Sequence, residues 1–132
     1  MTFDAHQFKR LERAGYNRLG PRYLAQAATR QALADAVLAA AKLAPGQYVL
    51  DLASGPGLLA KSAHVVIGPT GLAIASDIAE AQLACCPGLL RVAADGEHLP
   101  FANRSFDRLL CGLGLMLFPN TDHALREMHR VL

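Results

Sequence analysis

Cysteine, charge and long apolar runs are all scarce in this 132-residue sequence, and each scarcity excludes a class of protein. Three cysteines, two of them adjacent, fit reduced thiols better than a disulfide framework. No apolar run approaches the ~20 residues that cross a bilayer, and residues 1–6 lack the layout of a signal peptide. No Cys-x-x-Cys or His-Glu-x-x-His spacing occurs, so we expect no metal site. We expect a cytoplasmic protein without a transmembrane segment.

The remaining composition is that of one small globular domain. Hydrophobic residues make up 52% of the chain and charged residues 18%, which excludes the disordered and low-complexity classes. The net charge of +2 is too small to argue for a polyanionic partner. Basic residues nevertheless gather in the first quarter, at Lys9, Arg10, Arg13, Arg18, Arg22 and Arg30. We interpret them as a solvated helix face; a surface for nucleic acid or anionic lipid is the alternative, and no aromatic interleaving supports it.

Periodicity and turn residues divide the chain into an N-terminal helical segment, residues 1–47, and a core, residues 48–132. Apolar residues recur at spacings of three and four over 21–43, which predicts a helix that Pro21 begins and Pro45-Gly46 ends. In the core, short apolar runs indicate strands at 48–53, 72–76, 89–94 and 106–112. Helices are expected over 58–66, over 78–85, and from 120 or 121 onward with Ala124, Leu125, Met128, Val131 and Leu132 on one stripe.

Strands that alternate with helices predict an α/β fold with a parallel sheet, and right-handed crossovers favour a doubly wound, Rossmann-like arrangement of about four strands. In such sheets, ligands bind beyond the carboxyl ends of the strands. The sequence places there the turn Gly55-Pro56-Gly57, then Asp77, Asp95 and Gly112, each at the end of a predicted strand. Two carboxylates and a glycine turn should therefore converge on one edge of the sheet.

The spacing Gly55-x-Gly57-x-x-Ala60, with Asp77 about 20 residues further on, also matches the dinucleotide fingerprint, so an NAD-dependent oxidoreductase is one hypothesis. Asp51 argues against it. A carboxylate inside the strand, just before the glycine turn, repels a diphosphate and attracts a cation. A cationic ligand with an adenosine end fits better, and S-adenosylmethionine (SAM) is such a ligand.

Several motifs resemble the class I SAM-dependent methyltransferases, in the same order along the chain. Residues 49–57, Val-Leu-Asp-Leu-Ala-Ser-Gly-Pro-Gly, resemble the first motif of that family, and residues 94–101 with 105–107 resemble the second and third. Residues 112–120 and 124–132 are similar to the ubiquinone/menaquinone biosynthesis C-methyltransferases in particular. The resemblance implies SAM as cofactor and a small-molecule methyl acceptor of quinone or phenol type.

The resemblance also implies which residues hold the methionine part of SAM. Asp51 would hold the ammonium group. The turn that contains Ala53, Ser54, Gly55 and Gly57 would let the backbone approach closely, because a side chain at either glycine would collide with the ligand.

The adenosine part is assigned to the next strand ends in the same way. Asp77 would accept hydrogen bonds from both ribose hydroxyls, and Ile78 would pack on the adenine face. Asp95 would accept from the adenine amino group, the Gly96 amide would serve a ring nitrogen, and Gly112 would line the sulfonium. A cap or turn role is the alternative for Asp77 and for Asp95.

The general base is less well defined by the sequence. Methyl transfer needs a dry cavity, an oriented acceptor and the removal of one proton. Tyr16 and His98 are the candidates, with His123 behind them; in related enzymes the segment around Tyr16 folds over the cofactor. Loop packing is the alternative for His98, and a solvated position is the alternative for His123 and His129.

The sequence departs from the family in two places. The connection from Asp77 to Asp95 is short, so its helix should be clipped. The chain reaches Leu132 inside a helix where family members continue into further strands, so the fourth strand should be an exposed sheet edge. A fragment, a truncated paralogue, and a homodimer or partner chain that covers this edge are competing explanations. We expect a SAM-dependent methyltransferase; a catalytically silent SAM-binding subunit that acts through a partner is the alternative.

Overall fold

The computed structural model describes residues 2–132 and contains one four-stranded parallel sheet. Its strands lie in the order β3-β2-β1-β4 and span Tyr48–Leu52 (β1), Leu72–Asp77 (β2), Leu90–Ala93 (β3) and Arg108–Leu110 (β4). This arrangement confirms the Rossmann-like α/β prediction and makes β4 an edge strand, as expected. Within the described part of the chain, no helix has the length and hydropathy that a membrane span requires.

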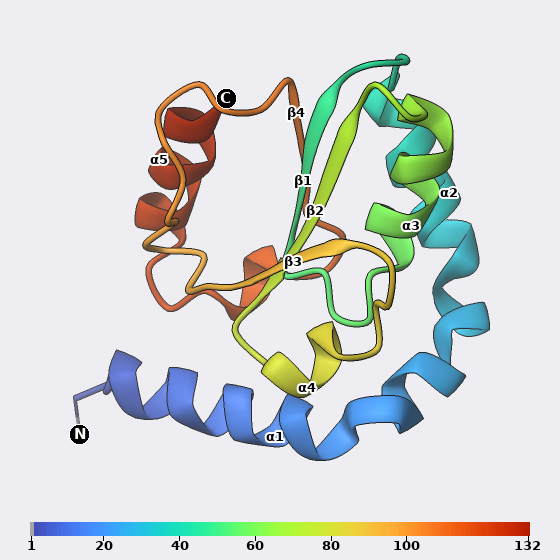
Figure 1. The fold of residues 1–132 in the computed structure, drawn as a ribbon. Coiled ribbons are helices and arrows are strands. Elements are labelled where there is room, and N and C mark those ends of the chain that lie inside the picture. The colour runs from blue at the N-terminus through green and yellow to red at the C-terminus, as the bar shows by residue number, and fades with distance from the viewer. Residues whose placement is uncertain (1) are drawn as a thin grey trace.

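Helices cover both faces of this sheet (Figure 1). Val49 of β1 packs with α2 (Gln31–Ala41) and α3 (Leu58–Ile67) on one face. Leu50 and Leu52 pack with α5 (Thr121–Val131) on the other face. Because successive strand residues point to opposite faces and both faces are covered, β1 is apolar on both sides apart from Asp51. The two helical layers therefore leave the ends of the strands as the open part of the sheet.

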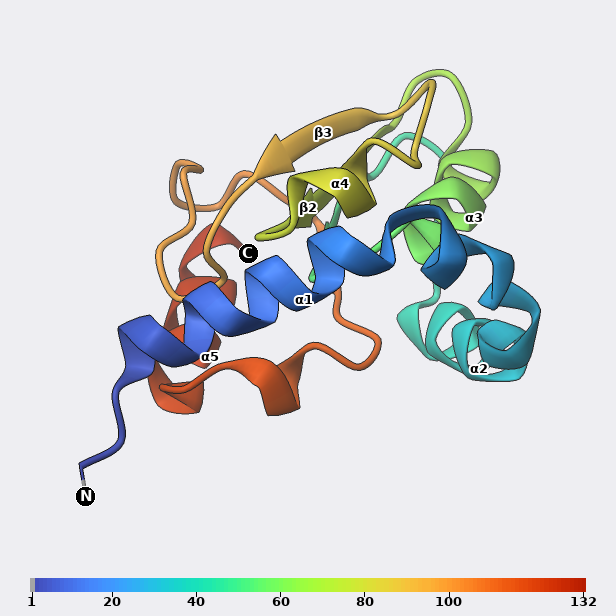
Figure 2. The ribbon, with the colours of Figure 1, turned by 90° about the horizontal axis from the view of Figure 1, so that it is seen from below.

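The N-terminal helix α1 (Ala5–Ala25) lies across the carboxyl ends of the strands, beside the short helix α4 (Glu80–Leu83) (Figure 2). The predicted continuous helix over 21–43 is wrong. Pro21 does begin a helical stretch after a kink at Gly20, but that stretch ends at Ala25, and a 3-10 helix η1 (Ala27–Arg30) precedes α2. The helix propensity of this alanine-rich stretch is overridden here, because the chain must turn from the carboxyl edge onto a face of the sheet.

Three details differ from the sequence-based expectations in extent. Strand β3 is mostly exposed, because it is the other edge of the sheet. The buried stripe of α5 consists of Ala124, Met128 and Val131, whereas Leu125 and Leu132 are 47% and 48% exposed. Helix α4 has only four residues and is shorter than the expected 78–85, although the short connection after Asp77 does predict a clipped helix. A further 3-10 helix, η2 (Leu115–Leu117), follows β4.

Candidate functional site

A pocket lies at the carboxyl edge of the sheet, and residues of α1 form part of its wall. Its lining includes most of the predicted site residues: Tyr16, Asp51, Ala53, Ser54, Gly55, Asp77, Ile78, Asp95, Gly96 and Gly112. Gly57 and His98 are not among the lining residues. The predicted convergence of two carboxylates and the glycine turn is therefore present in the structure.

Asp51 lines this pocket and has one carboxylate oxygen without a partner among the described residues. The side chain is 1% exposed, and its Oδ2 accepts a hydrogen bond from the Ala60 amide of α3 at 2.9 Å. Its Oδ1 is buried and has no hydrogen-bond partner among the described residues. Burial raises the pKa of Asp51 to about 7; the Ala60 amide opposes this shift and the charge of Asp77 adds to it. An unpartnered carboxylate oxygen in a pocket fits a ligand that brings a cationic donor.

Asp77 accepts hydrogen bonds from the backbone of the glycine turn and from the backbone that directly follows β2. Its Oδ2 accepts from the Gly55 amide at 2.8 Å, and its Oδ1 accepts from the Ala79 amide at 2.8 Å. Burial raises the pKa of Asp77, although these amides act in the opposite direction. Each carboxylate oxygen has a second lone pair, so the turn role and the predicted ribose role are compatible.

The two glycines of the turn have different physical reasons to be glycine. Both have positive φ, +52° at Gly55 and +78° at Gly57. Gly55 lines the pocket, and a Cβ there would lie 3.4 Å from the ring of Tyr23. Gly57 precedes α3 outside the pocket lining, and a side chain there would collide with the Cys86 sulfur. The collision predicted between a Gly57 side chain and a ligand is therefore replaced in this structure by a collision with the core.

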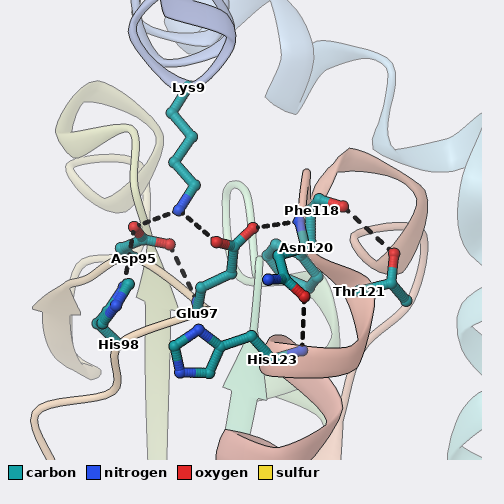
Figure 3. A network of polar contacts seen from close by, with 8 residues as sticks. All are labelled: Lys9, Asp95, Glu97, His98, Phe118, Asn120, Thr121 and His123. Atoms are coloured by element: carbon teal, nitrogen blue, oxygen red, sulfur yellow. Dashed lines mark hydrogen bonds and ion pairs between the residues drawn. The ribbon is translucent and has the colours of Figure 1, made fainter. Parts of the chain in front are cut away.

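Asp95 belongs to a polar network that ties α1 to the end of β3 (Figure 3). The Lys9 ammonium donates to Asp95 Oδ2 and to Glu97 Oε2, both at 2.7 Å. Glu97 is 4% exposed, and its other oxygen accepts from the Asn120 amide at 2.8 Å. Burial alone would raise the pKa of Asp95, but Lys9 and the Glu97 amide outweigh burial and lower it. Burial disfavours the charged form of Lys9, but the two carboxylates outweigh burial and raise the pKa of Lys9 above its usual value. The network therefore holds three buried or half-buried charges in compensated form.

The interpretation of the early basic residues as a solvated face is wrong for Lys9 and Arg30. Lys9 forms the network above, and the Arg30 guanidinium lies over the Tyr23 ring, 3.9 Å from its centroid. Arg13 pairs with Glu80 but keeps a solvated side chain, 52% exposed. The sequence contained a signal that one face of the N-terminal helix lines a site. Four polar or aromatic residues follow one another there at spacings of three, four and seven: Lys9, Glu12, Tyr16 and Tyr23. All four line the pocket.

The two candidate bases occupy different places. Tyr16 lines the pocket with its ring edge-on to Tyr23, at a centroid distance of 5.7 Å. Burial raises the pKa of Tyr16, and the neighbouring Tyr23, Glu12 and Asp77 raise it further. The His98 side chain is 67% exposed, and its ring packs on His123 at 4.8 Å (Figure 3). The structure thus brings Tyr16 to the site and places His98 in a surface contact.

A doubly wound parallel sheet with a glycine turn after β1 and carboxylates at the ends of β2 and β3 defines a Rossmann-like nucleoside-binding domain. Residues 50–132 match the family described as methyltransferase domain. The chain belongs to this family, the SAM-dependent methyltransferases, whose cofactor is S-adenosylmethionine. The hypothesis of an NAD-dependent oxidoreductase is thereby wrong.

Relatives and solved structures agree with this assignment. The chain is 38% identical over 108 residues to the ubiquinone/menaquinone biosynthesis C-methyltransferase UbiE of Coxiella burnetii, which covers 74% of this chain and 43% of that protein. It is 40% identical over 103 residues to the protein of the same name from Ralstonia pickettii, covering 72% and 42%. The chain therefore spans less than half the length of these relatives.

The fold is shared with solved methyltransferase structures. A putative methyltransferase of Haloferax volcanii, solved in complex with the Trm112 methyltransferase activator, superposes with a TM-score of 0.80 at 18% identity, covering 89% of this chain and 55% of that chain. A SAM-dependent methyltransferase from Aquifex aeolicus gives a TM-score of 0.71 at 18% identity, covering 98% and 68%. At these identities the likeness concerns the fold alone.

Proposed function

We propose that this chain binds SAM at the carboxyl edge of its sheet and methylates a small aromatic acceptor of quinol or phenol type. The observation that carries the proposal is the orphaned Asp51 Oδ1, a buried carboxylate oxygen of a residue that lines the pocket, which a cationic ligand group would satisfy. Asp51 would hold the ammonium group, and Gly55 leaves room for the backbone to approach the ligand. Asp77 would hold the ribose and Asp95 the adenine amino group.

The acceptor would lie against the α1 side of the same pocket. Bound SAM supplies an electrophilic methyl group, so the chain has only to exclude water, orient the acceptor and remove a proton. Leu33, Val37, Leu113 and Phe118 line the pocket with apolar surface. Tyr16, which lines the pocket, would orient an acceptor hydroxyl. Glu12, one helical turn earlier on α1, lines the pocket too and is a second group that can accept a proton.

Calorimetric titration with SAM tests the cofactor assignment. Asp77→Ala should weaken SAM binding at least about tenfold, because two hydrogen bonds to a charged group are lost. Asp122→Ala, which removes an exposed carboxylate from the first turn of α5, is the matched control and should bind like the unmodified chain. Equal heats for Asp77→Ala and the unmodified chain would reject the ribose assignment.

A catalytically silent SAM-binding subunit is the second candidate. Strand β4 is a sheet edge, and a neighbour of the same fold was solved with an activator protein bound. An edge strand offers unpaired backbone groups to another chain. Turnover measured over quinol, phenol and amine acceptors separates the two candidates, since SAM binding without turnover of any of them supports the silent subunit.

A further inference from the structure

The N-terminal wall of the pocket contains a cation that the cofactor assignment does not use. Arg30 of η1 lines the pocket beside Tyr16 and Tyr23 of α1 and Leu33 and Val37 of α2. The Arg30 side chain is half-buried, and its contacts within the chain are with Tyr23. Because the wall belongs to the part of the pocket where we place the acceptor, the inference below rests on the proposed function.

Tyr23 fixes the position of Arg30 in two ways. One terminal nitrogen of the guanidinium donates to the Tyr23 carbonyl oxygen at 2.8 Å, and the guanidinium carbon lies 3.9 Å from the centroid of the Tyr23 ring. Such a cation over an aromatic face is held at low conformational cost. The single hydrogen bond uses one of five N–H donors, so most of the donor capacity of Arg30 is unused by the chain.

No carboxylate of residues 2–132 compensates the charge of Arg30. The ion pairs of the described chain involve Lys9, Arg13, His98 and Arg130, but not Arg30. The other pocket-lining cation, Lys9, is saturated by two carboxylates. Glu12 lines the pocket as well but makes no ion pair with Arg30. A half-buried charge among apolar side chains is unfavourable unless a partner arrives.

We propose that Arg30 recognises an anionic oxygen on the aromatic acceptor, either a carboxylate or an ionised hydroxyl. The planar guanidinium matches the two oxygens of a carboxylate with two parallel donors, which a lysine cannot do, and it can also donate to the single oxygen of an ionised hydroxyl. Tyr16 and Tyr23 would bound the aromatic part of the acceptor, and the apolar residues of α2 would exclude water. The proposed acceptor class is thereby narrowed from quinols and phenols in general to those that carry an anionic oxygen.

The test compares naphthoate with its neutral isostere naphthamide, titrated calorimetrically into the chain saturated with SAM. The unmodified chain should bind naphthoate about tenfold more tightly than naphthamide, the effect of one charge-assisted contact. Arg30→Gln should lose this preference while binding SAM as tightly as before. Arg22→Gln, at an exposed position of α1 outside the pocket lining, is the matched control and should keep the preference. Equal binding of the two probes to the unmodified chain, or a preference that survives Arg30→Gln, would overturn the proposal.

A second variant covers the case in which Arg30→Gln does not fold. Arg30→Lys keeps the charge over Tyr23 but removes the two parallel donors, so the preference for naphthoate should fall to about threefold. An unchanged preference would overturn the recognition by the guanidinium. The SAM titration judges the proposed function separately: a chain that binds no SAM but prefers naphthoate would contradict the methyltransferase proposal and leave the role of Arg30 standing.

Discussion

The two ends of the pocket differ in whether their charged side chains are paired within the chain. At the end where we propose that the adenosine binds, Lys9 is bonded to both Asp95 and Glu97, so each of these three charges has a partner from within the chain. At the other end, Asp51 Oδ1 has no hydrogen-bond partner among the described residues, and Arg30 forms no ion pair with any of their carboxylates. The difference indicates that paired charges hold α1 on the sheet, whereas unpaired charges are available to ligands.

The strongest way to break the comparison is to remove the cation of the paired end. Lys9→Met leaves the carboxylates of Asp95 and Glu97 half-buried and buried without compensation, so the free energy of unfolding should fall by about 2–4 kcal/mol. Arg13→Met is the matched control on the same helix; Arg13 and its partner Glu80 are exposed, so the loss should be much smaller than for Lys9→Met. Urea denaturation measures both. Equal losses for the two variants would show that burial does not decide the strength of these pairs.

The unpaired carboxyl of Asp51 should make the free energy of unfolding depend on pH. The pKa of Asp51 is raised from 3.8 to about 7, so the folded state binds a proton that the unfolded state has released. The free energy of unfolding should therefore fall as pH rises between about 4 and 7, by at most about 1.4 kcal/mol per pH unit, and level off above that window. Asp51→Asn, which can still accept from the Ala60 amide, should reduce this slope to the part that the raised pKa of Asp77 contributes.

The same substitution sharpens the ligand side of the comparison. Ionised Asp51 attracts the ammonium group, so SAM should bind about tenfold more tightly at about pH 8 than at about pH 6. At about pH 8, Asp51→Asn should bind SAM more weakly than the unmodified chain does. The affinity of this variant for SAM should change little with pH. Calorimetry at the two pH values measures this; a dependence that persists in Asp51→Asn would assign the titration to another group.

The sequence identifies the part of the site that the strand ends carry and misses the ion pairs that depend on where α1 docks. Asp51, Gly55 and Asp77 follow directly from strand ends, because parallel strands bring their carboxyl ends to one edge. The pairing of Lys9 with Asp95 joins residues 86 positions apart and depends on where α1 docks, which no local pattern fixes.

The break in the predicted helix over 21–43 has the same origin. Intrinsic propensity favours a continuous helix there, but the chain turns from the sheet edge onto its face at η1. That turn is what places Arg30 in the pocket wall, so the feature that the periodicity misses is also the one that carries the unpaired cation.

His98 offers the finest test of the comparison, because it contacts the same carboxylate as Lys9. Its Nδ1 lies 3.6 Å from Asp95 Oδ2, but its side chain is 67% exposed, against 16% for Lys9. An exposed pair at this distance contributes little, so His98→Ala should change the free energy of unfolding by less than about 0.5 kcal/mol. The affinity for SAM, measured by calorimetry, should stay within about twofold. A tenfold loss of SAM affinity or of turnover would instead place His98 in the catalytic machinery, and the surface contact with His123 would then be a resting position of a functional side chain.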